Sequence, residues 1–293
     1  MEENLTLSGQ NILFLGAGSI AEAIVRGLVA RHAAKPERVT VTNRFNRERL
    51  ERLRAAYGVQ AEQNPDRVRK LAAQADVVVL AMKPADAPAA LLAYRGLFAD
   101  KQLIVSVIAG LSIGVIRELL GNGRLPVART MPNTSSSIGL GMTGISFSEG
   151  MPEDKQQLTL EMFRAVGDTV LTREEDLHIL TGISGSGPAY VYYFAEALIS
   201  GGLQGGLSQE DAKALAVSTL LGAANMIRET GENPAELRRK VTSPNGTTQA
   251  AIETLERYSF KEAVEQAVIR CAARSREIAD TIDSNAKALA SDL

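Results

Sequence analysis

The chain has little of several residue types, and each shortage excludes a class of protein. Its 293 residues contain one cysteine, two histidines and no tryptophan. A single cysteine, Cys271, cannot form a disulfide within the chain, so we expect a reducing, cytoplasmic setting and a small core residue at that position. One cysteine and two distant histidines cannot assemble a cluster of soft metal ligands, so we expect no metal site.

Charge and hydropathy exclude two kinds of partner. The net charge is −2, whereas a nucleic-acid-binding surface needs a strong basic excess. No apolar run reaches the roughly 18 residues that a membrane span needs. The N-terminal residues include two acids and no basic segment of the kind that begins a secretory signal. We therefore expect a soluble protein that binds neither nucleic acid nor membrane.

The first part of the chain alternates short apolar runs with helical patterns. Apolar residues make up 45% of the chain, which is ample for a packed core. Continuous apolar strands that alternate with helices are typical of a parallel sheet covered on both faces. The expected strands are 12–15, 39–42, 76–81, 103–108 and 126–130, and the expected helices are 19–31, 47–57 and 112–120.

After about residue 172 the strand signal stops and only helical patterns follow. Thr172 with Glu175 is predicted to be a capping box at the start of this part. We predict an α/β chain, with an N-terminal Rossmann-type doubly wound parallel sheet at 1–172 and an all-α domain at 173–293. The helices expected in the second domain are 188–201, 208–229, a short one from Asn233-Pro234, 247–258 and 259–289. The pair Ser208 and Asp211 predicts the start of the second of these helices.

The predicted helices of the second domain contain many alanines and glycines, so they carry mostly small side chains. Small side chains permit close helix packing, either inside one bundle or between two copies of the chain. We favour a homodimer or a higher homo-oligomer, because a helical bundle joined to a nucleotide domain commonly needs a partner to bury its apolar faces. The size of the assembly beyond a dimer stays open.

A glycine turn follows the first expected strand and precedes a helix. In the pattern Gly16-x-Gly18-x-x-Ala21, the first glycine allows a tight turn and the second lets a pyrophosphate approach the backbone. The N–H groups and partial positive charge at the helix start favour a phosphate. The turn predicts contacts between a dinucleotide and Gly16, Ala17, Gly18, Ser19 and Ile20.

The end of the second expected strand indicates which dinucleotide binds. An NAD site usually has Asp or Glu there, but this chain has Asn43 and Arg44. Arg44 would attract the 2′-phosphate of NADP and Asn43 would hydrogen-bond to it, so we expect NADPH to be preferred and NADH to be possible. Arg47, about one helical turn further on, is a second candidate. The arginines that follow are interpreted as an exposed helix face: Arg49, Arg52 and Arg54.

Turns after the later expected strands complete the cofactor pocket, because ligands of open α/β sheets bind at the carboxyl ends of the strands. Lys83 ends a buried strand and precedes a proline, so it is a candidate catalytic and cofactor-binding residue, although a lone lysine is more often a solvated charge. The turn at 109–110 is expected to line the same pocket. The remaining candidates for cofactor contact are Ala81, Met82, Pro84 and Asn133.

Two polar turns begin helices in the second domain, at 184–188 and at 243–248. Each presents backbone N–H groups and short hydroxyls at a helix start, where an anionic small molecule can dock. A nucleotide domain combined with such turns predicts a two-substrate reductase. Ser184 and Ser186 are expected to shape their loop rather than to take part in chemistry.

Together these motifs resemble the pyrroline-5-carboxylate reductase family, which catalyses the last step of proline biosynthesis. The resemblance covers nearly the whole chain, and the family's C-terminal signature corresponds to Val241 through about Glu256. One departure concerns the turn at 243–246, where the family often has Ser-Pro-Gly-Gly and this chain has Asn245. Asn adopts left-handed backbone angles more readily than most residues, so we expect the turn to survive.

The resemblance implies hydride transfer from NAD(P)H to the cyclic imine 1-pyrroline-5-carboxylate, giving L-proline. It implies a pocket shared by the nucleotide domain and the intertwined helices of a dimer. The substrate carboxylate would rest on backbone N–H groups around the 243–248 turn, and the Thr248 hydroxyl would meet the imine nitrogen. In the alternative interpretation, the two threonines are only helix caps. The substrate-binding candidates are Ser243, Asn245, Gly246, Thr247 and Thr248.

Other functions stay open beside this one. One alternative is a related Rossmann reductase that acts on another imine, a six-membered one included, or on a β-hydroxy acid. The latter chemistry needs a general base, often a lysine on the helix after the boundary, and no lysine occurs there before Lys213. A non-catalytic NADPH-binding regulator is the third possibility, and the complete hydroxyl turn at 243–248 disfavours it.

Overall fold

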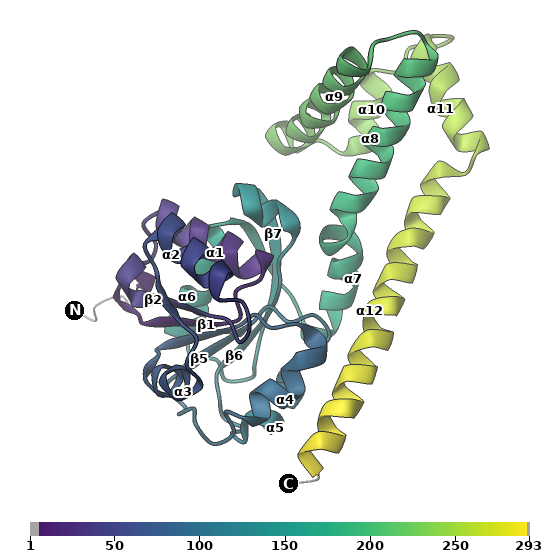
Figure 1. Cartoon of the computed structure of the whole chain (residues 1–293). Coiled ribbons are helices and arrows are strands. Elements are labelled where there is room, and N and C mark those ends of the chain that lie inside the picture. Colours follow the sequence, from purple (N-terminus) through teal and green to yellow (C-terminus); the bar gives the residue numbers. More distant parts are fainter. Residues whose placement is uncertain (1–5, 292–293) are drawn as a thin grey trace. The chain divides into compact units, whose positions relative to one another are not determined.

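The computed structural model describes residues 6–291. The chain divides into two compact units, one made of residues up to Gly185 together with those from Arg270 onward, and the other of Ser186–Ile269 (Figure 1). The boundary that the sequence places at residue 172 coincides with the end of the last strand, β8 (Gly167–Leu171), and it stays a prediction.

The first unit is built on an eight-stranded sheet with the order β3-β2-β1-β4-β5-β6-β7-β8. Neighbouring strands are parallel except β6 and β7, which are antiparallel, and β7 is a strand that the sequence analysis does not predict. The other strands are β1 (Ile12–Leu15), β2 (Val39–Thr42), β3 (Gln60–Glu62), β4 (Val77–Leu80), β5 (Leu103–Ser106), β6 (Val127–Met131) and β7 (Gly141–Phe147).

Helices cover both faces of this sheet (Figure 1). Side chains of a strand alternate between faces, so Ile12 and Phe14 join one core cluster while Leu13 and Leu15 join the other. The first face is covered by α1 (Ser19–Ala30), α2 (Arg47–Tyr57) and α6 (Glu153–Arg164), and the second by α3 (Pro65–Gln74), α4 (Ala87–Leu92) and α5 (Ile113–Leu120). The predicted Rossmann-type doubly wound domain is confirmed.

Two local predictions in this unit are wrong. Thr172 does not form the predicted capping box, because the N-cap position before the next helical turn is occupied by Arg173 and the backbone N–H of Thr172 donates to the carbonyl of Ile145 in the sheet. The chain then forms a 3₁₀ turn (Glu174–Asp176) whose first residue follows Arg173, and the short helix α7 (Leu177–Leu180). Cys271 is half-buried rather than a core residue.

The second unit is helical, and its helix starts agree with the sequence. It contains α8 (Gly187–Gln204), α9 (Gln209–Thr230), α10 (Pro234–Lys240) and α11 (Thr247–Arg257), and α12 (Phe260–Ser291) begins here and continues into the first unit. The Ser208 side chain accepts a hydrogen bond from the Asp211 N–H at the start of α9, as its capping pattern predicts. No helix within residues 6–291 is long and apolar enough to cross a membrane.

Candidate active site

The glycine turn lies between β1 and α1, where the strand order reverses. Gly16 has a φ of 118°, and a Cβ there would overlap the carbonyl oxygen of Ala81 after β4, so the fold itself requires glycine. Gly18, the N-cap of α1, has a φ of −73°, which any residue can adopt. A Cβ at Gly18 would meet no atom within 4 Å. Since packing does not require glycine there, the open space before the α1 N-terminus fits a dinucleotide pyrophosphate.

Hydrogen bonds within the loop after β2 fix the backbone on both sides of Arg44. The Oδ1 atom of Asn43 accepts hydrogen bonds from the N–H groups of Phe45 at 3.0 Å and Asn46 at 2.9 Å. Asn43 therefore uses its carbonyl oxygen to shape the loop. Arg44 is exposed, and its guanidinium carbon lies 5.1 Å from the centroid of the Phe45 ring. An exposed cation and no carboxylate at this position suit a 2′-phosphate.

A cavity of about 410 Å³ lies at the carboxyl ends of β5 and β6. Ser19 and Ile20 of α1 line one side, Val107 and Ala109 follow β5, and Asn133 follows β6. The volume falls within the range of small-molecule sites, and apolar walls with a few polar groups suit a nicotinamide ring. The structure thus brings together three of the predicted cofactor residues, and it adds Val107, which sequence reasoning missed.

A second cavity of similar volume lies at the opposite edge of the sheet. It is about 410 Å³, and its walls include Asn11, Arg38 and Gln74 at or near the amino ends of β1, β2 and β4. Ligands of open α/β sheets bind at the carboxyl ends of the strands. This position favours the cavity beside α1 over the second cavity as a ligand site.

Asn133 is held by its own side chain. Its Nδ2 donates to the carbonyl of Ser184 at 3.0 Å, and its Oδ1 accepts from the N–H of Met142 at 3.2 Å. These bonds tie the segment after β6 both to β7 and to a π-helical turn, Thr181–Gly185, that leads into α8. Because the amide already has these partners, Asn133 positions the cavity wall, and its direct contact with a cofactor stays a prediction.

The segment after β4 lies beside the glycine turn. The N–H of Ala81 donates to the carbonyl of Leu15 at 2.9 Å, which sets Ala81 and Met82 next to Gly16. Lys83 is exposed, and its carbonyl accepts from Asp86 in the 3₁₀ turn Pro84–Asp86. The exposed lysine is consistent with either interpretation made from the sequence, and a catalytic role stays a prediction.

The hydroxyl turn at 243–248 belongs to the second unit and begins α11. Asn245 has a φ of 57°, so it adopts the left-handed conformation expected of asparagine. Its N–H donates to Oε1 of Gln249 at 2.8 Å, and the N–H of Gly246 donates to the carbonyl of Ser243 at 3.1 Å. These two N–H groups, expected to hold a carboxylate, are therefore used inside the turn.

The N–H groups of Thr247 and Thr248 open α11, and the first turn of a helix has no carbonyl partner for such groups. Thr248 is half-buried and Thr247 is exposed. A Cβ at Gly246 would lie 2.5 Å from Oγ of Ser243, so glycine leaves room for that hydroxyl beside the backbone of the turn. An anion that docks here has two threonine N–H groups available.

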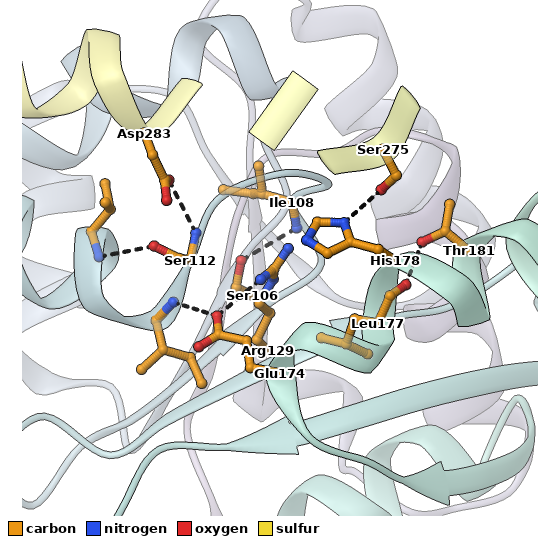
Figure 2. A network of polar contacts seen from close by, with 12 residues as sticks. Ser106, Ile108, Ser112, Arg129, Glu174, Leu177, His178, Thr181, Ser275 and Asp283 are labelled. Carbon is orange, nitrogen blue, oxygen red and sulfur yellow. Dashed lines mark hydrogen bonds and ion pairs between the residues drawn. The ribbon is translucent and has the colours of Figure 1, made fainter. Parts of the chain in front are cut away.

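Sequence reasoning missed a polar network at the ends of β5 and β6 (Figure 2). Arg129 of β6 is 6% exposed, and its Nη1 lies 2.9 Å from Oε1 of Glu174. The same oxygen accepts the Ile113 N–H at 2.8 Å and so caps the start of α5. A buried cation is thereby paired with a carboxylate that also satisfies a helix end.

The same network reaches α12 (Figure 2). Nδ1 of His178 lies 3.0 Å from Oγ of Ser275, and the N–H of Ser112 donates to Asp283 at 3.4 Å. Burial lowers the pKa of His178, and the positive charges of Arg129 and Arg276 lower it further. These contacts fix the C-terminal part of α12 against α5 and α7.

The structure contradicts one interpretation made from charge alone. Arg49 is not part of a solvated face, since its side chain is 18% exposed and its Nε donates to the carbonyl of Ala17 at 2.9 Å. Arg52 and Arg54 are exposed as expected. Arg49 and Ala17 are 32 positions apart along the chain, and helical periodicity does not predict a contact over that separation.

Comparison with known proteins decides the family. The family described as pyrroline-5-carboxylate reductase dimerisation matches residues 174–278, and the family described as NADP oxidoreductase, coenzyme F420-dependent, matches residues 11–110. Pyrroline-5-carboxylate reductase 1 of Bacillus spizizenii is 40% identical over 280 residues, which cover 96% of this chain and 93% of the relative. The chain belongs to the pyrroline-5-carboxylate reductase family.

Plant relatives and solved structures agree with this assignment. The pyrroline-5-carboxylate reductase of Arabidopsis thaliana is 36% identical, covering 92% of this chain and 95% of the relative. The structure of the Coxiella burnetii reductase matches with a TM-score of 0.85 at 36% identity, covering 92% of this chain and 98% of that one. The Plasmodium falciparum structure, with NADP bound, matches with a TM-score of 0.83 at 26% identity, covering 93% and 99%. The predicted family, NADP cofactor and dimerisation region are confirmed.

Proposed function

We propose that this chain reduces 1-pyrroline-5-carboxylate to L-proline with NADPH, the final step of proline biosynthesis. The observation that carries the proposal is the 40% identity to a pyrroline-5-carboxylate reductase over 96% of the chain. NADPH, when bound, supplies the hydride, which adds to the carbon of the C=N bond, and the nitrogen ends protonated. An imine of this kind needs no protein nucleophile, so the protein contributes mainly by positioning.

The residues at the strand ends would hold the cofactor. The turn from Gly16 to Ile20 would hold the pyrophosphate at the start of α1, and Arg44 would bind the 2′-phosphate. Val107 and Ala109 would give the nicotinamide an apolar wall and exclude water from it. Lys83, exposed at the end of β4, adds positive charge on the side of the sheet where the anionic cofactor binds.

The turn that opens α11 would hold the substrate. The backbone N–H groups of Thr247 and Thr248 are available for the carboxylate, and the Thr248 hydroxyl would donate to the imine nitrogen. Ser243, Asn245 and Gly246 support this arrangement by building the turn, through the Gly246 to Ser243 hydrogen bond and the left-handed Asn245.

We further propose that the enzyme is a cytoplasmic homodimer or higher homo-oligomer built on the helical unit. The dimerisation family matches residues 174–278. Within 186–269, only Ala212 and Ala216 are buried, so this unit has almost no core of its own. A second copy would supply the missing burial. The single cysteine supports a reducing compartment.

A coupled assay with the purified chain tests the proposed reaction. NADPH oxidation should begin only when 1-pyrroline-5-carboxylate is added, and one proline should form for each NADPH consumed. Incubation of NADP⁺ with β-hydroxy acids should give no NADPH. Oxidation of a β-hydroxy acid without reduction of the imine would favour the related dehydrogenase, and no turnover with either would favour a binding protein.

A further inference from the structure

Arg49 of α2 contacts the glycine turn from the protein side. Its Nε donates to the carbonyl oxygen of Ala17 at 2.9 Å, and its Nη2 lies 2.6 Å from Oε2 of Glu22 in the first turn of α1. The Arg49 side chain is 18% exposed and that of Glu22 is 27% exposed. One guanidinium therefore bridges the turn and the helix that would together hold the pyrophosphate.

Local hydrogen bonds fix the start of the helix that carries Arg49. Asn46 caps α2 by accepting the Arg49 N–H at 2.8 Å, and the N–H of Asn46 donates to Oδ1 of Asn43 at 2.9 Å. The loop that presents Arg44 is thus connected through the α2 cap to Arg49. A continuous set of bonds joins the two parts of the proposed cofactor site.

The position of Glu22 makes this bridge electrostatically important. The N-terminus of α1 favours an anion through its N–H groups and dipole, and a carboxylate in the first turn opposes a second anion there. Arg49 compensates that charge at close range. Arg52 also reaches Glu22, at 3.4 Å, but its side chain is 60% exposed, so its contribution is screened by solvent.

The hydrogen bond from Arg49 to the carbonyl of Ala17 fixes the orientation of the Ala17–Gly18 peptide group. In a trans peptide the C=O and the following N–H point in opposite directions. Because Arg49 holds the Ala17 carbonyl toward α2, the Gly18 N–H points away from α2. Losing this bond removes the side-chain contact that fixes the peptide immediately before α1.

We infer that Arg49 is a positioning residue for the dinucleotide: it fixes the Ala17–Gly18 peptide and offsets the Glu22 charge beside the pyrophosphate site. The inference rests on the proposed use of NADPH and goes beyond it by assigning a residue that acts on the shared part of NADPH and NADH. Arg44, by contrast, would act on the 2′-phosphate alone.

Direct binding measurements on the full-length protein test this role without the imine substrate. Calorimetric titration with NADPH and with NADH compares wild type, Arg49→Gln, Arg49→Lys and Arg49→Gln combined with Glu22→Gln. The matched control is Arg54→Gln, which removes an exposed arginine from the same helix. Thermal unfolding without ligand shows whether each variant is folded, and Arg44→Ala provides a contrast at the 2′-phosphate.

Arg49→Gln should weaken NADPH and NADH by similar factors, about tenfold, which is about 1.4 kcal/mol. Adding Glu22→Gln to Arg49→Gln should recover part of the lost affinity for both cofactors. Arg49→Lys should bind both cofactors more tightly than Arg49→Gln does, and Arg54→Gln should bind them with the wild-type affinity. Arg44→Ala should weaken NADPH far more than NADH. The role is refuted if Arg49→Gln binds both cofactors with the wild-type affinity, or if its affinity falls for NADPH alone. It is also refuted if adding Glu22→Gln restores none of the lost affinity. Failure of imine reduction with these binding results intact would instead refute the proposed function.

Discussion

Gly16 and Gly18 lie in one turn but lack side chains for different reasons. Gly16→Ala should lower the free energy of unfolding by about 1–3 kcal/mol, because its φ of 118° is strained for alanine and its Cβ would overlap Ala81. Gly18→Ala should unfold at nearly the wild-type temperature, since its Cβ enters open space. It should nevertheless weaken NADPH binding about tenfold or more.

Thermal unfolding and NADPH titration of the two variants separate these effects. Normal NADPH binding by Gly18→Ala would show that the pyrophosphate does not approach this turn. A stable Gly16→Ala variant would show that the turn has another low-energy conformation.

Thr248 offers the most direct test of the substrate turn. A hydroxyl that donates to the imine nitrogen is most useful in the transition state, so Thr248→Ala should lower kcat about tenfold or more, or about 1.4 kcal/mol of barrier. The KM for the imine should change less, because the backbone N–H groups remain. Thr248→Ser should recover much of the rate. If the alanine variant turns over at the wild-type rate from about pH 6 to about pH 9, Thr248 acts only as a helix cap and not in catalysis.

Single residues were predictable where their role depends on local sequence. The glycine pattern identifies Gly16, and the pair Ser208 and Asp211 predicts a real helix cap. The sequence does not reveal that Arg49 is largely buried, because its partners, Ala17 and Glu22, lie on other elements. Asn133 likewise bonds to Ser184, 51 positions away, and no local pattern reports such a contact.

At the scale of elements, buried apolar strands were predictable and small-residue strands were not. The sequence predicts β1 and β2 with the bounds observed. It misses β7, whose segment is rich in glycine and hydroxyl residues, and its partner β8. A Cβ at Gly167 would overlap the backbone of Gly141 on the adjacent strand, so these glycines serve a non-local backbone approach. The sequence analysis also misses the short, polar β3 and the helices α3, α4 and α6.

The network around His178 should make the contact between α7 and α12 sensitive to pH. The pKa of His178 is lowered below its ordinary value of 6.5, chiefly by burial. The unfolded chain therefore binds a proton more readily, and stability should decrease as the pH falls from about 6.5 through the folded-state pKa. The charged groups that act on His178 are Arg129, Glu174, Arg276 and Asp280.

Thermal unfolding of wild type and His178→Gln between about pH 7 and about pH 5 tests this effect. Wild type should lose more stability over this range than the variant, whose amide does not titrate. Parallel losses in both proteins would mean that other groups cause the dependence. The carboxyl groups of Glu62, Asp176 and Glu277, whose pKa values are lowered, act below this window.

At the scale of the whole molecule, the helical unit should require a second copy. Large apolar side chains are exposed on it, among them Leu215 at 57% and Leu221 at 59% on α9. Sedimentation velocity should therefore show a dimer or a larger assembly. Replacing both leucines with glutamate should shift the protein toward monomer, whereas Lys213→Glu, an exposed polar change on the same helix, should not. A monomeric wild-type protein would contradict the proposed assembly.

The overall organisation was predictable because the motifs of both domains occur in one chain. The path of α12 was not, since its helical pattern continues from Phe260 to Ser291 although the chain passes from one compact unit to the other at Arg270. Its packing depends on a distant glycine. Gly110 has a φ of 80°, and a Cβ there would lie 3.1 Å from Cδ1 of Ile282.

Hydride transfer from NADPH to the imine carbon of 1-pyrroline-5-carboxylate can be followed with an isotope. The most direct measurement uses NADPH that carries deuterium in the transferable position of the nicotinamide and analyses the product by mass spectrometry. We expect proline with one deuterium, bound to the ring carbon that was double-bonded to nitrogen. Unlabelled proline, or no proline while the protein is folded and binds NADPH, would contradict it.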